Sequence, residues 1–248
     1  MQWKVVRIDF TERCACVFGT KTHYITSGKG YVVVDVDGNE RFSGPNCARN
    51  PDFVVNPDEN VPDLTKGCLE PDGEDSGPKI TVPSVETGGA TKKPALMSDK
   101  IKHNAIAYLL LRVEKLKHFK KIKYRKLDVV YERYKNSGLT DSDYAFLNRL
   151  VDAKDFPEYS LKNLQAIYAC DFWINQFIKN ECNRDLTFVD GCRSYLHRKL
   201  ALTPSQITGL NSWFDNSNGR RMVRLKSNSF VINPGNYWGD DCSINENL

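Results

Sequence analysis

Apolar and polar residues alternate in the first part of the chain. Residues 2–10 alternate and are rich in Trp, Val, Ile and Phe, and residues 31–36 form a β-branched run that ends at Asp37-Gly38. Both patterns are typical of strands, and Asp-Gly favours a hairpin turn because both central positions take positive φ. Residues 40–43 are expected to return as the next strand. The pattern predicts a small antiparallel module over residues 1–55. A module of this size is too small for a large core and needs a stabilising cross-link, such as a bound metal ion.

A helical period replaces this alternation from Ser98 onward. Ser98 can cap a helix, and Ile101, Ala105 and Leu109 recur after it at helical spacing. The period continues in five further segments. They predict helices at about 126–137, 140–153, 160–180, 188–199 and 203–215. Beyond residue 216 the period is lost, and residues 222–225 and 230–232 are expected to be short strands.

Proline and acidic residues separate the two patterns. Residues 56–98 hold six prolines and almost no apolar period, and residues 57–75 carry seven acids against one Lys. This composition is typical of a linker. We therefore predict an α+β protein. Its expected parts are a small zinc-ribbon-like antiparallel β module over 1–55, an acidic linker over 56–98, a basic helical bundle over 99–216, and a basic β-ribbon and tail over 217–248.

An internal repeat lies within the helical part. Residues 139–152 align with residues 202–215 at a constant offset of 63, and six of the fourteen positions are identical. Each copy begins with a capping box, the first at Thr140 and the second at Thr203. The repeat predicts two helix-turn-helix-like hairpins, the alternative being coincidence between two common helix starts.

The densest charge lies in residues 112–126, which hold eight Lys or Arg and one Glu. On a continuous helix, the apolar residues would form a buried stripe while the cations face solvent and attract phosphates. A second, smaller basic patch follows Gly219. The alternative is a plain solvated face. The expected nucleic-acid contacts are Arg112, Lys115, Lys117, Lys120, Lys121, Lys123, Arg125, Lys126, Arg220, Arg221 and Arg224.

Four of the eight cysteines precede residue 70. A zinc ion takes four Cys or His ligands in a tetrahedron, and such an ion can staple a small module. The expected ligands are Cys14, Cys16 and Cys47, with Cys68 or His23 as the fourth. Reduced structural thiols or a redox pair are the alternatives.

These motifs resemble a zinc module of phage and plasmid proteins. The residues that carry the resemblance are Cys14, Cys16, Gly19, Thr20, Tyr24, Gly44, Cys47 and Ala48. The capped Leu-Thr helices also resemble tail modules of phage proteins. In size and in the order of its parts, the chain is similar to the large subunit of type IV CRISPR effector complexes as well. The resemblance implies a Zn²⁺-binding protein of a phage or plasmid system.

Motifs of common enzyme sites do not occur in the chain: there is no phosphate-binding P-loop, no His-Glu-x-x-His and no Gly-x-Ser-x-Gly. Asp240-Asp241 is expected to be a solvated pair, and His197 to be a surface residue of a helix. No run approaches the roughly 18 apolar residues of a membrane span, and the N-terminus has no apolar signal stretch. We expect a non-catalytic, cytoplasmic protein, the alternative being a novel nuclease whose site carries none of these motifs.

The charge pattern favours binding of DNA or RNA. The alternative is a role in protein–protein interaction, either as a subunit of an RNA-guided DNA-targeting complex or as an inhibitor of host or defence proteins. The two classes differ in their response to salt, because binding to phosphates weakens steeply as the salt concentration rises.

Overall fold

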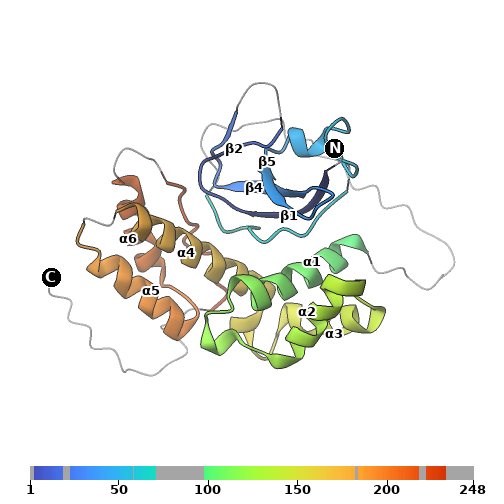
Figure 1. Ribbon diagram of the computed structural model, residues 1–248. Helices are drawn as coiled ribbons and strands as arrows, with labels where there is room; N and C mark the ends of the chain where they lie inside the picture. Colours follow the sequence, from blue (N-terminus) through green and yellow to red (C-terminus); the bar gives the residue numbers. More distant parts are fainter. Residues whose placement is uncertain are drawn as a thin grey trace, which may run out of the picture.

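The alternating N-terminal segments form two small antiparallel sheets. The computed structural model describes residues 3–18, 23–57, 59–70, 98–181, 184–217 and 222–232. One sheet has three strands in the order β1-β4-β5, and the other pairs β2 with β3. The strands are β1 (Lys4–Phe10), β2 (Cys14–Ala15), β3 (Tyr24–Ile25), β4 (Lys29–Val34) and β5 (Glu40–Ser43). The small β module is therefore confirmed (Figure 1).

The hairpin between β4 and β5 lies where the sequence predicts it, but its turn differs from the expected one. Only Gly38 takes a positive φ, of 83°, in this turn. The Asp35 carboxylate accepts hydrogen bonds from the backbone N–H groups of Asp37 and Asn39, each at 2.9 Å. A side chain therefore organises a longer loop than the two-residue turn that Asp-Gly predicts.

Six α-helices follow the β module among the described residues, which confirms the α+β class (Figure 1). They are α1 (Asp99–Leu110), α2 (Arg125–Ser137), α3 (Asp141–Asp152), α4 (Leu161–Asn180), α5 (Thr187–Lys199) and α6 (Pro204–Asp215). Shorter helical turns are formed by Cys47–Arg49, Leu111–Lys115, Lys120–Ile122 and Pro157–Tyr159. Within the described part of the chain, no helix combines the length and the apolar character that crossing a membrane requires.

Both predicted capping boxes are present. The Thr140 hydroxyl accepts from the backbone N–H of Asp143, whose carboxylate accepts from the backbone N–H of Thr140. Thr203 and Gln206 make the same reciprocal pair at the start of α6. Each box satisfies N–H groups that a helix start leaves without partners, so these two helices begin where the sequence places them.

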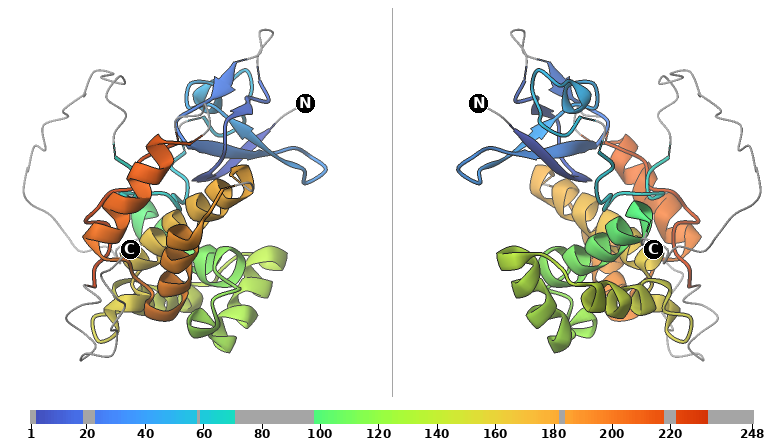
Figure 2. Two further views of the ribbon diagram at one scale, coloured as in Figure 1. Left: turned by 90° about the vertical axis from the view of Figure 1, so that its left-hand side faces the viewer. Right: turned by 90° about the vertical axis from the view of Figure 1, so that its right-hand side faces the viewer.

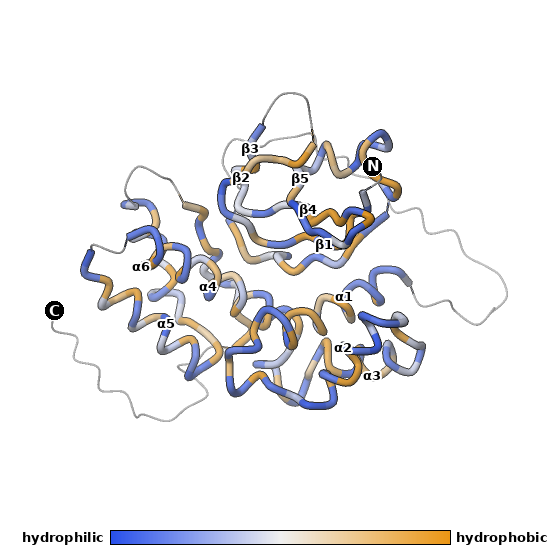
Figure 3. The backbone as a smooth tube through the Cα atoms, in the orientation of Figure 1, coloured by the Kyte–Doolittle hydropathy of each residue, from blue (hydrophilic) through white to orange (hydrophobic). Residues whose placement is uncertain are grey.

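The β module packs against the helical part (Figures 1 and 2). Phe10, at the end of β1, is 2% exposed and packs its ring against Tyr168, Phe172 and Trp173 of α4. Figure 3 shows apolar stretches along β4 and in α1, in keeping with the buried side chains of these elements. Burial of apolar area is the main force that holds the two parts together.

A buried carboxylate adds polar contacts to this interface. Asp9 is 2% exposed, and its Oδ1 accepts a hydrogen bond of 2.7 Å from the Tyr168 hydroxyl of α4. Its Oδ2 lies 2.6 Å from Lys115 Nζ and 3.1 Å from Arg7 Nε. A buried charge is tolerated when it is paired and hydrogen-bonded, and Asp9 meets both conditions.

The first part of the predicted acidic linker is folded. Leu64 and Cys68 are almost fully buried, and Asn56 bonds the backbone N–H and carbonyl of Val5. Figure 1 shows residues 59–70 passing between the sheet and the helices. The linker boundary at residue 56 is therefore wrong, because Leu64 and Cys68 interrupt the acids and enter the helical core, while Asn56 bonds strand β1. Residues 71–97 lie outside the described residues.

The predicted continuous helix over the basic segment is also wrong. Helix α1 ends in a π-helical turn, Leu111–Lys115, which we call the wide turn. A separate short turn, Lys120–Ile122, then precedes α2. Leu116, Phe119 and Ile122 are at most 1% exposed. These apolar residues recur at intervals of three. That spacing places them on one side of a helix, but consecutive short turns bury the same residues equally well, so the pattern does not distinguish the two structures.

The predicted C-terminal β-ribbon is not formed within residues 222–232. Leu225 instead makes a single antiparallel bridge to Leu69. Glu70 N donates to Arg224 O at 3.0 Å, and Lys226 N donates to Cys68 O at 2.9 Å. The segment 68–70 thus supplies the backbone hydrogen-bond partners that the second strand of a hairpin would have supplied. The tail from residue 233 lies outside the described residues.

Replacement of Asp9 by Ala is expected to lower the free energy of unfolding by about 3–5 kcal/mol, because Lys115 would keep a half-buried charge without its partner. The control is Glu132→Ala, which breaks an exposed pair with Lys135 and should have a much smaller effect. Urea unfolding followed by circular dichroism measures both variants. Equally small effects in the two variants would show that Asp9 does not hold the sheet on the helices.

Candidate nucleic-acid interface and metal centre

One of the predicted nucleic-acid contacts, Arg112, is a buried structural residue. The residue is 8% exposed, and its guanidinium donates to Ile122 O at 2.7 Å and to the Tyr108 hydroxyl at 2.6 Å. The guanidinium also lies near the rings of Tyr108 and Tyr159. Arg112 therefore anchors the turn Lys120–Ile122 to α1.

Three further predicted contacts are engaged within the protein. Lys115 pairs with Asp9, and Lys121 Nζ donates to Arg198 O at 2.6 Å. Arg224 pairs with Glu70 and with Asp215. These three cations stabilise contacts within the protein and are therefore not free to neutralise phosphates. Arg220 and Arg221 lie outside the described residues.

Five predicted cations are exposed and have no ion pair among the described residues. They lie close together in sequence, from the turn after residue 116 to the first turn of α2. These residues, the basic face, are Lys117, Lys120, Lys123, Arg125 and Lys126. Such a group of uncompensated cations raises the local positive potential and attracts polyanions.

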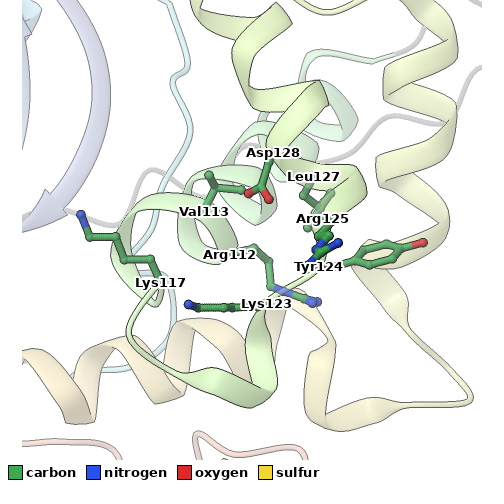
Figure 4. Close-up of a pocket in the computed structure, with 8 residues that line it drawn as sticks. All are labelled: Arg112, Val113, Lys117, Lys123, Tyr124, Arg125, Leu127 and Asp128. Carbon is green, nitrogen blue, oxygen red and sulfur yellow. The ribbon is translucent and has the colours of Figure 1, made fainter.

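The basic face borders a cleft of about 640 Å³. Figure 4 shows Lys117 and Lys123 on one side of this cleft, Tyr124 and Arg125 on the other, and Arg112 between them. The cleft has one acidic side chain in its lining, that of Asp128. We call it the basic cleft.

A second hollow, of about 300 Å³, adjoins the basic cleft, because Arg112 and Tyr124 line both. It adds the cations Arg149 and Lys154, the acid Asp155 and the ring of Phe156. Phe156 is 63% exposed and Tyr124 is 37% exposed. Large exposed rings beside cations are available to stack on a flat ligand.

The predicted metal ligands are partly brought together in the β module. The ligand atoms of Cys16, His23 and Cys47 all lie within 4.8 Å of one another. Cys47 Sγ is 3.6 Å from His23 Nε2. In a tetrahedral zinc site, bonds of about 2.3 Å to sulfur and about 2.0–2.1 Å to nitrogen place these two atoms about 3.6 Å apart. The group could hold a metal ion.

One hydrogen bond in this group favours a thiolate ligand, whereas burial favours the neutral thiol. Gly44 N donates to Cys16 Sγ at 3.4 Å, the kind of outer hydrogen bond that orients a ligand and stabilises its charge. Burial raises the pKa of the Cys47 thiol, and the neighbouring Cys16 raises it further. A bound cation would have the opposite effect on this pKa.

The structure does not place the other two predicted ligands in this group. Cys14 Sγ lies 3.3 Å from Thr11 Oγ1 instead. Cys68 is 2% exposed and belongs to the core of the helical part, and burial raises the pKa of its thiol to about 12. Of the two alternatives for the fourth ligand, the structure thus places His23, and not Cys68, beside Cys16 and Cys47.

A second group of potential ligands was not predicted from the sequence. His118 comes from the turn after Leu111–Lys115, Asp171 from α4 and His197 from α5, and their ligand atoms also lie within 4.8 Å of one another. His197 is half-buried rather than a simple surface residue. Local sequence patterns carry no signal for this group, because its members are far apart along the chain.

Comparison with known proteins identifies no relative: no family model, no curated protein and no solved structure matches this chain. The resemblances to phage and plasmid zinc modules and to a CRISPR subunit therefore stay predictions.

Cobalt titration tests which cysteines bind a metal. Thiolate ligands give Co²⁺ an intense near-ultraviolet charge-transfer absorption, which we expect in the wild-type protein. Cys16→Ser and Cys47→Ser should each reduce it to half or less, since each removes one of the two sulfur ligands, and His23→Ala should weaken cobalt binding. Cys68→Ser and Cys14→Ser are the matched controls. Loss of the band in Cys68→Ser with an unchanged band in Cys47→Ser would contradict this assignment.

Proposed function

We propose that this protein binds single-stranded nucleic acid along the basic cleft and the hollow that adjoins it. One observation carries the proposal: unpaired cations and exposed aromatic rings line two adjoining hollows that share Arg112 and Tyr124. The cations lie where a sugar–phosphate backbone could follow the cleft, and the rings lie where its bases could stack.

The cations account for affinity in this proposal. Lys117, Lys123 and Arg125 line the basic cleft, and no carboxylate among the described residues pairs with any of them. Neutralisation of phosphates by such residues releases counterions, and this release drives binding at moderate salt. Phosphate contacts do not distinguish bases, so weak sequence preference follows.

The aromatic rings favour a single strand over a duplex. Tyr124 and Phe156 expose a large part of their side chains beside the cations. A base within a duplex is stacked on both sides, whereas an unpaired base can stack on a protein ring. Each such stack contributes about 1–3 kcal/mol and tolerates any base.

In this proposal, the group Cys16, His23 and Cys47 of the β module binds a metal ion with a structural role. We propose zinc as its ion, since two thiolates and one imidazole are typical zinc ligands. The core of this module is small, with Val5, Phe18 and Val33 among its buried residues. A metal that joins the β2–β3 sheet to the turn Cys47–Arg49 would add the stability that a core of this size does not supply.

The triple variant Lys117→Ala, Lys123→Ala and Arg125→Ala tests the interface. It should weaken binding to a single-stranded oligonucleotide and lower the slope of log affinity against log salt by about 2, at roughly 0.7 for each phosphate that is no longer neutralised. Fluorescence anisotropy over a salt series measures both quantities. The wild-type protein should also prefer the single strand to a duplex of the same sequence.

The control is Lys4→Ala, Lys29→Ala and Arg41→Ala, which removes the same charges from exposed positions on β1, β4 and β5. Its affinity and slope should stay close to the wild-type values. If the cleft variant instead keeps both values on DNA and on RNA, the proposed interface is wrong. A partner that copurifies at high salt would then favour the role in protein–protein interaction.

A further inference from the structure

We propose that His118, Asp171 and His197 form a second metal site, which binds a divalent transition ion such as zinc with three protein ligands and an open fourth position. His118 follows the wide turn Leu111–Lys115, Asp171 lies in the middle of α4, and His197 lies in the last turn of α5. This site is separate from the thiol group of the β module and does not depend on nucleic-acid binding.

The spacing of the ligand atoms suits a tetrahedral ion. His118 Nε2 lies 3.0 Å from Asp171 Oδ2, and His197 Nε2 lies 3.5 Å from Asp171 Oδ1. Bonds of about 2.0–2.1 Å to nitrogen and oxygen place two ligands of a tetrahedron about 3.3 Å apart. The two distances are close to this edge length but join different oxygens of Asp171, and all three ligand atoms lie within 4.8 Å of one another, so rotations of the rings and of the carboxylate would bring them to the spacing that the ion needs.

The carboxylate at the centre of the group is buried and incompletely satisfied. Asp171 is 5% exposed, and its neighbour Cys170 belongs to the helical core. Among the described residues, no donor forms a hydrogen bond with Asp171 Oδ1, although this atom is shielded from solvent. A buried carboxylate needs compensation by positive charge, and a divalent cation between the three ligands supplies it.

Packing holds both imidazoles in place. The Phe119 ring stacks on His197 with centroids 4.0 Å apart and an interplanar angle of 12°, and it also lies against His118. Lys121 binds the carbonyl of Arg198, the residue after His197, and so ties the turn that carries His118 to the end of α5. Prearranged ligands lose little conformational entropy when an ion binds.

The chemistry of the ligands selects the class of ion. Two imidazoles and one carboxylate suit zinc and its neighbours in the transition series, whereas calcium and magnesium prefer oxygen ligands throughout. The side chains of His118 and His197 are 43% and 37% exposed, so an ion can enter from solvent. The fourth position is then filled by water or by an anionic group, as in zinc sites that keep one open position.

Histidine ring resonances in the wild-type protein test this proposal directly. The chain has four histidines: His118 and His197 in this site, His23 in the thiol group, and His103 outside both. As Zn²⁺ is added, the ring signals of His118 and His197 should shift together and reach saturation. His103 should not respond. If His118 and His197 stay unchanged after the His23 signal has saturated, the site does not exist.

The variant Asp171→Asn provides the second test, because the amide keeps the shape of the carboxylate but loses its charge. Zinc affinity at this site should fall by more than the roughly 10–100-fold typical of losing an outer-shell partner, while the His23 response persists. The control His103→Gln should retain all of its zinc. If Asp171→Asn binds zinc at this site as tightly as the wild-type protein, the three residues are only a hydrogen-bonded cluster and the proposal is wrong.

Discussion

The buried Asp9 carboxylate orients the β module on the helices, beside the apolar burial that holds the two parts together. It lies at the end of β1 and binds Tyr168 of α4 and Lys115 of the wide turn that follows α1. Phe10 inserts beside it among the aromatic residues of α4. The sheet is thereby fixed on the helices, and Lys115 is withdrawn from the surface. The basic face begins only after this fixed point, at Lys117.

Two of the helix starts could be predicted from the sequence because their determinants are local. Thr140 and Thr203 start helices through capping boxes that span three residues, and the apolar period continues from there. The break after Leu111–Lys115 could not be predicted in this way. Leu116, Phe119 and Ile122 keep a spacing that also fits a helix, while the contacts that stabilise the turn, such as Arg112 with Ile122 O, form only in the folded chain.

The candidate sites show the same difference between local and long-range information. Cys16 and Cys47 flank a hairpin, so the sequence alone indicates that they converge, whereas Cys68 is drawn into the helical core by the apolar residues around it. Asp171 meets His118 and His197 only because α4 lies beside α5 and beside the turn that ends at Phe119. The group forms only in the folded chain, and no spacing of residues in the sequence predicts it.

Photochemical cross-linking tests most directly whether this surface binds nucleic acid. A single-stranded oligonucleotide with photoreactive bases is bound to the wild-type protein, irradiated, and mapped on the protein by mass spectrometry. Bases that stack on the exposed rings beside the basic cleft should cross-link to peptides that contain Tyr124 or Phe156, and a competing unlabelled strand should abolish the signal. Cross-links confined to peptides of the β module or of α6, with none at the two rings, would contradict the account.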